Sequence, residues 1–465
     1  MSRPTFFFYD LETSGLSPSD ARIMQFAGQR TSLDFQPLGD PVNLLVKLDD
    51  DTLPSPGAIL TTKITPQKTL EEGIPERELA QFLMSDIFTP DTIILGFNSV
   101  RFDDRFLQHL FWRNFYDPYE WQWKDGRSRW DMLDVVRMTR ALRPEGITWC
   151  FTEDGKPTNR LELLTKANGI SHESAHDALS DVNALIDVTR LIKEKQPSLF
   201  NFLFRLRDKR EVKALINLDR PAPFVYTSGR FGSAHNFTTV AFPLFHTKND
   251  NLLVFDLRYN LEEKLAELES ASDPKSPLLK DRLFPLFKEL APNKCPAVAP
   301  LSVLEAKDGW QKLDLTKDIV DKHLKILMSH PDLLETLKTE FRSSSFDRPP
   351  IDVEASLYDA FPPDSDKLRF SAIRAMSSPE EFADFHPNFA DDRLPDLLLH
   401  YKAKNFPTSL SESEAEAWQS YRTARLTRQA PAFLKELETF SNQGADSFLL
   451  EELSLYYQSL QEADY

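Results

Sequence analysis

Thr5-Phe-Phe-Phe-Tyr-Asp-Leu-Glu-Thr13 combines a run of aromatic residues with two acids. The aromatic run predicts a buried strand that delivers Asp10 at its end. Because side chains alternate along a strand, Asp10 and Glu12 should project to the same side. Two carboxylates on one side are suitable ligands for a hard divalent cation such as Mg2+. The alternative is a surface strand end with two solvated acids, in a chain that has 72 acidic residues.

A third acid follows a second expected strand. Thr92-Ile-Ile-Leu95 is short and apolar, Gly96-Phe-Asn98 predicts a turn, and residues 103–112 have helical periodicity. Asp103 would lie in the first turn of this helix, where the helix dipole favours a carboxylate. The alternative is that Asp103 or Asp104 only caps the helix.

The third segment pairs an imidazole with a carboxylate. Apolar residues from Ala178 onward follow a helical pattern that places Asp181 one turn into a helix. Positions five apart on a helix differ by about 140°, so His176 must sit on the preceding loop or first turn. There it would lean over a metal held by Asp181 and act as general base for an attacking water. The alternative is a structural histidine.

The same segment contains a zinc-protease pattern, His172-Glu-Ser-Ala-His176. That motif requires both histidines on one face of a continuous helix. Here Asn168-Gly169 closes the preceding helix, and Ser171 and Ser174 favour turns and caps. We therefore interpret the match as accidental.

Length, charge and cysteine content limit the possible classes. At 465 residues the chain exceeds what one hydrophobic core organises, so two or three domains are expected. Neither a long apolar run nor a signal-peptide pattern occurs, which predicts a cytoplasmic protein. Two cysteines are too few for a disulfide framework or a Cys-based zinc site. The net charge of -17 argues against a generally basic surface, so nucleic acid would bind locally or through metals.

The organisation of the chain changes at about residue 195 and again at about residue 350. Short β-like segments at 224–227, 237–242 and 252–257 predict a small β-rich domain with helices attached. The Pro349-Pro350 pair predicts a hinge. Helices are expected beyond it at 397–404, 411–428 and 432–463, the second beginning at Ser411 with Glu414 at capping-box spacing.

Together the three acidic segments resemble the DEDDh 3′→5′ exonuclease superfamily. Its pattern has Asp-x-Glu after a strand, Asp after an Asn-containing turn, and His-x(4)-Asp opening the last helix, and none of the five positions departs from it. Further segments are similar to the bacterial exonuclease I family: Trp130-Asp-Met-Leu-Asp-Val-Val-Arg137, Ala141-Leu-Arg-Pro-Glu-Gly146, Arg160-Leu-Glu-Leu-Leu-Thr-Lys-Ala-Asn-Gly169 and Tyr401-Lys-Ala-Lys-Asn-Phe-Pro407. Because these lie in the first and last thirds, the similarity covers nearly the whole chain.

The resemblance implies an α/β (α+β) protein with three domains. These are a ribonuclease H-like DEDDh exonuclease domain at 1–195, an SH3-like β-barrel-containing domain at 196–348 and a C-terminal helical domain at 351–465. The implied reaction is processive 3′→5′ hydrolysis of single-stranded DNA in repair or recombination, releasing 5′-mononucleotides. Two Mg2+ ions, with Mn2+ as a substitute, would be held by Asp10, Glu12, Asp103 and Asp181, while His176 takes the proton of water.

Substrate contacts are expected next to the acids and along the strand's path. The expected set is Glu12, Thr13, Leu16, Gln108, Trp123, Arg137, Arg160 and Lys209. Between residues 119 and 143, Trp121, Trp123 and Trp130 are interleaved with arginines, a pattern typical of sequence-tolerant single-strand binding. The alternative is that these tryptophans fill a core. Lys209 belongs to a basic cluster at 205–213 that would line the exit path or form a solvated helix face.

The resemblance also implies a protein partner. Members of the family bind the acidic, Phe-ending tail of single-stranded DNA-binding protein, and Arg143 is a candidate for that site. A domain arrangement that encloses the strand within one chain would make a monomer sufficient.

Two other functions compete with this one. An RNA-trimming DEDDh exoribonuclease would share the chemistry, but such enzymes are usually little more than the catalytic domain, so residues 196–465 disfavour it. A non-catalytic single-strand-binding scaffold would have no use for closely placed carboxylates that repel DNA.

Overall fold

The structure, a computed structural model, describes residues 3–172, 177–270, 279–283, 286–343 and 352–462. Two compact units divide the chain. The first contains Met1–Ser128, His172–Asn183 and Arg348–Tyr465, and the second contains Arg129–Ser171 and Ala184–Asp347. The chain passes between the units within strand β5 (Ser128–Asp131) and within helix α7 (Ala178–Lys195). The domain limits expected from the sequence stay a prediction.

Strand β1 (Thr5–Thr13) lies inside the sheet of the first unit. It pairs antiparallel with β2 (Ile23–Thr31) and parallel with β4 (Thr92–Gly96), while β3 (Val42–Leu45) pairs with the other edge of β2. The aromatic residues of β1 at positions 6–9 are all buried, as expected for a strand that is covered on both faces. The two strands expected around the acids are therefore confirmed.

Helices and short turns of the first 128 residues pack on this sheet. One core joins Phe7 and Tyr9 of β1 to Leu79 of α3 (Glu76–Phe82) and Phe106 of α4 (Asp103–Arg113). The remaining elements are α1 (Pro56–Thr62), α2 (Pro66–Glu72), the π-helical turn η1 (Leu83–Ile87), and the 3-10 turns η2 (Glu120–Gln122) and η3 (Lys124–Gly126).

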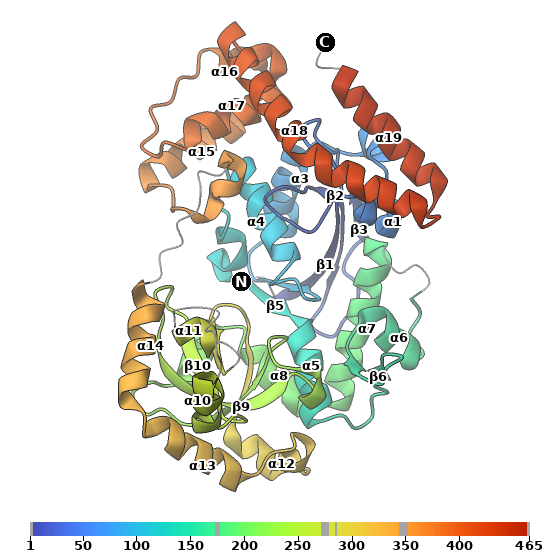
Figure 1. Cartoon of the computed structure of the whole chain (residues 1–465). Coiled ribbons are helices and arrows are strands. Elements are labelled where there is room, and N and C mark those ends of the chain that lie inside the picture. The colour runs from blue at the N-terminus through green and yellow to red at the C-terminus, as the bar shows by residue number, and fades with distance from the viewer. Residues whose placement is uncertain (1–2, 173–176, 271–278, 284–285, 344–351, 463–465) are drawn as a thin grey trace. The chain divides into compact units, whose positions relative to one another are not determined.

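The first unit is completed by helices from the C-terminal part of the chain. Phe370 and Leu397 share a core with Trp112 of α4, and Phe433 shares a second core with Ile59 of α1. Figure 1 shows the last two helices, coloured red, beside the blue α1. In order these elements are η6 (Val353–Tyr358), α15 (Asp364–Ala375), α16 (Pro379–Ala383), α17 (Leu394–Asn405), η7 (Pro407–Ser409), α18 (Glu412–Asn442) and α19 (Ser447–Glu462).

The start of α18 agrees with the sequence, but its end does not. Ser411 and Glu414 form the expected capping box. The helix then continues through Pro431 to Asn442, so the expected break near residue 430 is wrong. The helical conformation is interrupted instead around Gly444, whose φ of 70° lies in the left-handed region that glycine adopts without strain. Proline removed one helical hydrogen bond without ending the helix.

The second unit contains an antiparallel sheet in the order β11-β10-β9-β8-β12. Its strands are β8 (Phe224–Thr227), β9 (Thr238–His246), β10 (Leu252–Asp256), β11 (Phe287–Leu290) and β12 (Ala297–Pro300). The first three match the β-like segments read from the sequence. Since both units combine helices with a sheet, the predicted α/β (α+β) class is confirmed.

The second unit also contains helices, a short hairpin and 3-10 turns. They are α5 (Met132–Leu142), α6 (Leu161–Ala167), α8 (Pro197–Arg205), α9 (Lys209–Leu215), α10 (Leu261–Ser270), α11 (Leu279–Arg282), α12 (Gly309–Lys312), α13 (Lys317–Met328) and α14 (Pro331–Ser343), with the hairpin β6 (Cys150–Phe151) and β7 (Pro157–Thr158) and the 3-10 turns η4 (Ser233–His235) and η5 (Leu301–Glu305). Among the described residues of the whole chain, no helix is long and apolar enough to cross a membrane.

Candidate active site

Strand β1 places two acids on one side of the sheet. Asp10 lies opposite Ala27 and Glu12 opposite Gln25 in the pairing with β2. Leu11, between them, is buried, whereas both acids are only partly buried. This is the alternation that the sequence predicted, and it leaves both carboxylates at one surface.

Asp181 joins these two acids from helix α7. One carboxylate oxygen from each of Asp10, Glu12 and Asp181 lies within 4.8 Å of the others. Asp181 sits one turn into α7, and its backbone N–H donates to the Asp177 carbonyl at 3.0 Å. Gln25 of β2 donates to the Asp177 carboxylate at 3.2 Å, which ties the start of α7 to the strand beside β1.

Asp103 approaches the cluster from the start of α4. It is buried and is the first residue of that helix, as expected. It is not one of the three acids whose oxygens lie within 4.8 Å of one another, but its charge acts on Asp10. The neighbouring Asp104 accepts a 2.6 Å hydrogen bond from the Tyr9 hydroxyl, which fixes the helix end to β1.

The charges of these acids are crowded. Burial first, and then the charges of Asp103, Asp181 and Asp177, raise the pKa of Asp10 well above its usual range. Burial, followed by Asp10, Asp181 and Asp177, raises the pKa of Glu12 to about 9. Such a crowded group of carboxylate oxygens fits a hard divalent cation, which would favour their charged forms.

His172 contacts the cluster, which the sequence reading missed. Its Nε2 lies 2.6 Å from Asp181 Oδ1, and the side chain is almost fully buried. His172 precedes α7 in a non-helical stretch, in agreement with the rejection of the zinc-protease pattern. The only sequence signal for it was its place in that pattern. His176 lies outside the described residues, so its assignment as general base stays a prediction.

The residues expected beside the terminal nucleotide differ in exposure. Thr13 is buried and donates to the Gly15 carbonyl at 2.9 Å. Leu16 is 86% exposed at the tip of the following loop. Gln108 of α4 is buried and accepts a 2.7 Å hydrogen bond from the Tyr358 hydroxyl, which commits its carbonyl oxygen.

The three tryptophans expected either to stack on bases or to fill a core differ in burial. Trp121 and Trp130 are fully buried, so they fill cores, and for them the stacking interpretation is wrong. Trp123 is 63% exposed, and it alone of the three is available to a base.

The expected cationic contacts belong to the second unit. Arg137 lies 2.7 Å from Asp134 and stacks over the Phe237 ring. Arg160 precedes α6 and Lys209 begins α9, and both are exposed. Arg143 donates to the carbonyl of Val303 at 3.1 Å. Their expected roles in binding stay predictions.

Three family models match the chain. They are described as "Exonuclease" at residues 7–189, "Exonuclease I SH3-like domain" at 207–343 and "Exonuclease I C-terminal domain" at 351–460. Exodeoxyribonuclease I of Haemophilus influenzae is 37% identical over 98% of this chain and 97% of its own length. That of Escherichia coli is 38% identical over 95% of this chain and 94% of its own.

Solved structures of exonuclease I are also similar to this chain. A crystal structure of E. coli exonuclease I in complex with a dA16 oligonucleotide matches with a TM-score of 0.90 at 37% identity, covering 98% of this chain and 100% of that one. A zinc-bound form of an E. coli complex with single-stranded DNA matches with a TM-score of 0.90 at 36% identity, covering 99% and 100%. A structure described as suggesting how processivity is achieved matches with a TM-score of 0.88 at 36% identity, covering 98% and 99%.

Proposed function

The chain belongs to the exodeoxyribonuclease I family, and from this premise we propose that it degrades single-stranded DNA processively from the 3′ end, releasing 5′-mononucleotides. The observation that carries the proposal is the group of three carboxylates, Asp10, Glu12 and Asp181, whose oxygens converge within 4.8 Å. The relatives crystallised with single-stranded oligonucleotides supply the substrate class. The matches to residues 207–343 and 351–460 argue against a minimal RNA-trimming enzyme.

We propose that the site binds two divalent ions, Mg2+ with Mn2+ as a substitute. Asp10, Glu12 and Asp181 would be direct ligands, and Asp103 would add negative charge and a further oxygen. Oxygen ligands and the absence of sulfur in this group suit Mg2+ better than a soft metal. When bound, such ions activate water and stabilise the leaving oxygen of a phosphodiester.

The protein's own groups then have separate tasks. β1 and α7 hold the carboxylates at fixed spacing, so little reorganisation is needed when substrate arrives. His172 orients the Asp181 carboxylate by their 2.6 Å contact. His176 would remove the proton of the attacking water, as the sequence predicts. Glu12, Thr13 and Leu16 would meet the terminal nucleotide.

The remaining substrate contacts are proposed from their residue types. Trp123 would stack on a base, because its exposed ring has a free face for any of the four bases. Arg137, Arg160 and Lys209 would bind phosphates, and Gln108 would donate through its amide nitrogen. The exposure of Trp123, Arg160 and Lys209 supports their part of this proposal.

We further propose that the enzyme acts as a monomer in DNA repair or recombination and binds the acidic tail of single-stranded DNA-binding protein. Arg143 is the candidate contact. Two of its guanidinium nitrogens already donate to backbone carbonyls, of Leu142 and Val303, so the residue is held rigidly for such a role.

The polarity and substrate class can be tested together. The full chain with Mg2+ is incubated with single-stranded DNA labelled at either end, with duplex DNA and with RNA. We expect mononucleotides at once from the 3′-labelled strand, whereas the 5′ label should remain on long products until late. When excess unlabelled DNA is added as a trap for free enzyme, a processive enzyme should still degrade the labelled strands that it has already bound. Preference for RNA, or release beginning at the 5′ end, would contradict the proposal.

A further inference from the structure

The loop at residues 14–22 joins β1 to β2 directly after the acids Asp10 and Glu12. Its two ends are tied together, because Ser14 N–H donates to the Arg22 carbonyl at 2.9 Å and Arg22 N–H donates to the Ser14 hydroxyl at 2.8 Å. Leu16 at the tip is the most exposed large hydrophobic side chain among the described residues. An apolar side chain exposed to water only four residues after Glu12 is available to pack on a ligand.

Arg22 fixes the end of this loop through a partner more than 300 positions away in the sequence. Its side chain is 2% exposed, and Nη2 lies 2.5 Å from Glu354 Oε2 and 3.4 Å from Asp51 Oδ2. Glu354 belongs to η6, in the C-terminal part of the first unit, and is 1% exposed. A buried, charge-assisted hydrogen bond of this kind holds the arginine in one geometry.

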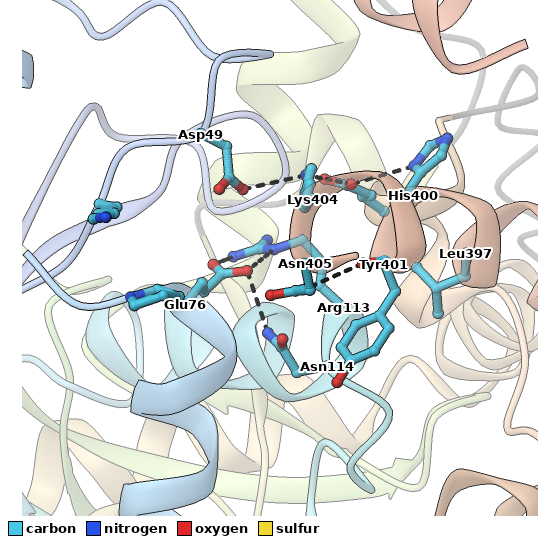
Figure 2. A pocket seen from close by; sticks show the side chains of 12 residues that line it. Asp49, Glu76, Arg113, Asn114, Leu397, His400, Tyr401, Lys404 and Asn405 are labelled. Atoms are coloured by element: carbon cyan, nitrogen blue, oxygen red, sulfur yellow. Dashed lines mark hydrogen bonds and ion pairs between the residues drawn. The ribbon is translucent and has the colours of Figure 1, made fainter. Parts of the chain in front are cut away.

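Glu354 is held in turn by helix α17. Lys404 Nζ lies 2.7 Å from Glu354 Oε1, and His400 Nδ1 lies 3.2 Å from the same oxygen. Burial opposes the ionisation of Glu354, but Lys404 and Arg22 outweigh it and hold its pKa well below the usual range. Lys404 Nζ also lies 3.3 Å from Asp49, and both residues line the pocket shown in Figure 2. The carboxylate that receives Arg22 is therefore charged and fixed.

Helix α18 holds the loop at a second point. Arg425 Nη2 donates to the Asp20 carbonyl at 3.0 Å, and its Nε donates to the Asp51 carbonyl at 3.0 Å. Asp352 accepts from the third nitrogen at 2.6 Å. This arginine is almost fully buried and uses its whole planar fork, which a lysine could not reproduce.

The same helix supports the beginning of the loop. Ser55 N–H donates to the Ser14 carbonyl at 2.7 Å, and the Ser55 hydroxyl donates to Glu436 of α18 at 2.8 Å. The loop thus receives support from the C-terminal helices at both ends, while its tip stays open to solvent.

We propose that Glu354 and Arg425 are positioning residues for the nuclease reaction. They hold Arg22 and Asp20, and so fix the 14–22 loop and present Leu16 to the terminal nucleotide, without touching the substrate themselves. The C-terminal helices would therefore order the loop when the protein folds. Binding of the DNA end would then not have to include the entropic cost of ordering the loop. The inference rests on the proposed function, since the terminal nucleotide is the ligand that Leu16 would meet.

The first test measures the loop without substrate. Hydrogen exchange followed by mass spectrometry reports on the loop amides that are bonded in the structure, those of Ser14, Asp20, Ala21 and Arg22. We expect Arg425→Ala to accelerate their exchange by about tenfold or more. The matched control is Lys402→Met, which breaks a 2.6 Å ion pair with Glu414 inside the C-terminal helices and should leave the loop unchanged.

The second test measures coupling to Leu16 on a single-stranded oligonucleotide with Mg2+. Glu354→Gln and Leu16→Ala should each lower kcat/KM by about 10- to 100-fold, mainly through KM, and the double variant should lose little more than the worse single one. Arg425→Lys serves if Arg425→Ala fails to fold. Unchanged loop exchange, or independent losses that multiply, would overturn the proposal. An inactive wild-type protein would instead refute the proposed function, and hydrogen exchange would still decide the positioning role.

Discussion

Burial and the neighbouring acids raise the pKa of Glu12 to about 9, which favours its protonated form at neutral pH while no cation is bound. Binding of the proposed Mg2+ would therefore displace a proton from the site, and its affinity should rise with pH. Without a cation, the clustered acids lower the free energy of unfolding of the protein. Such clusters are expected at functional sites, where charged groups are brought together for function rather than for stability.

This raised pKa predicts a pH dependence of stability in chelator. Between about pH 5 and pH 9, the folded protein keeps a proton on Glu12 that the unfolded chain releases, so stability falls as pH rises through this range. Glu12→Gln removes the titration. We expect the fall in Tm from pH 6 to pH 9 to be smaller by a few degrees in Glu12→Gln than in the wild type.

The control for this measurement is Glu416→Gln, an exposed position in α18. It should reproduce the wild-type slope. Equal slopes in Glu12→Gln and the wild type would show that Glu12 is not held protonated.

The positions of several individual site residues could be predicted from the sequence. Asp10, Glu12 and Asp181 converge because strand alternation and helical periodicity dictate where their side chains point. The contact of His172 with Asp181 was not predictable in the same way, since an irregular stretch has no periodicity from which to infer a direction.

In helix α18, the same substitution, Ser→Ala, should have opposite effects on stability at two positions. Ser411→Ala removes the capping side chain that accepts from the Glu414 N–H, and should destabilise the protein by about 1 kcal/mol. Ser420→Ala, at an exposed interior position of the same helix, should stabilise it by up to about 0.5 kcal/mol.

Urea unfolding of both variants provides the measurement. Equal effects of the same sign would mean that the helix does not begin at Ser411.

The elements also show where local patterns fail. The capping box at Ser411 could be predicted because it depends on two residues only three positions apart, Ser411 and Glu414. The continuation of α18 through Pro431 was not, because packing such as that of Phe433 against Ile59 outweighs the local cost of proline. Tertiary contacts decided the end of this helix, and Gly444 then allowed the turn.

For the whole molecule, the resemblance read from the sequence is confirmed over nearly the entire chain. The long-range ion pairs were not predictable. The chain has 55 cationic and 72 acidic residues, and nothing local to Arg22 or Glu354 indicates that they are partners. A single sequence specifies which residues are buried far better than it specifies which buried charges meet.

In the function proposed above, the carboxylates of Asp10, Glu12 and Asp181 hold the ions that drive hydrolysis of single-stranded DNA. The most direct measurement is single-turnover release from a 3′-labelled strand as Mg2+ is titrated, in the wild type, Asp181→Asn and Asp187→Asn. Asp187 lies on the same helix α7 and is paired with Arg190, so it is a matched control. We predict that Asp181→Asn lowers the rate by about a thousandfold or more at any Mg2+ concentration, while Asp187→Asn stays near the wild type. Mg2+-dependent release by Asp181→Asn at the wild-type rate would contradict the role of Asp181 as a metal ligand.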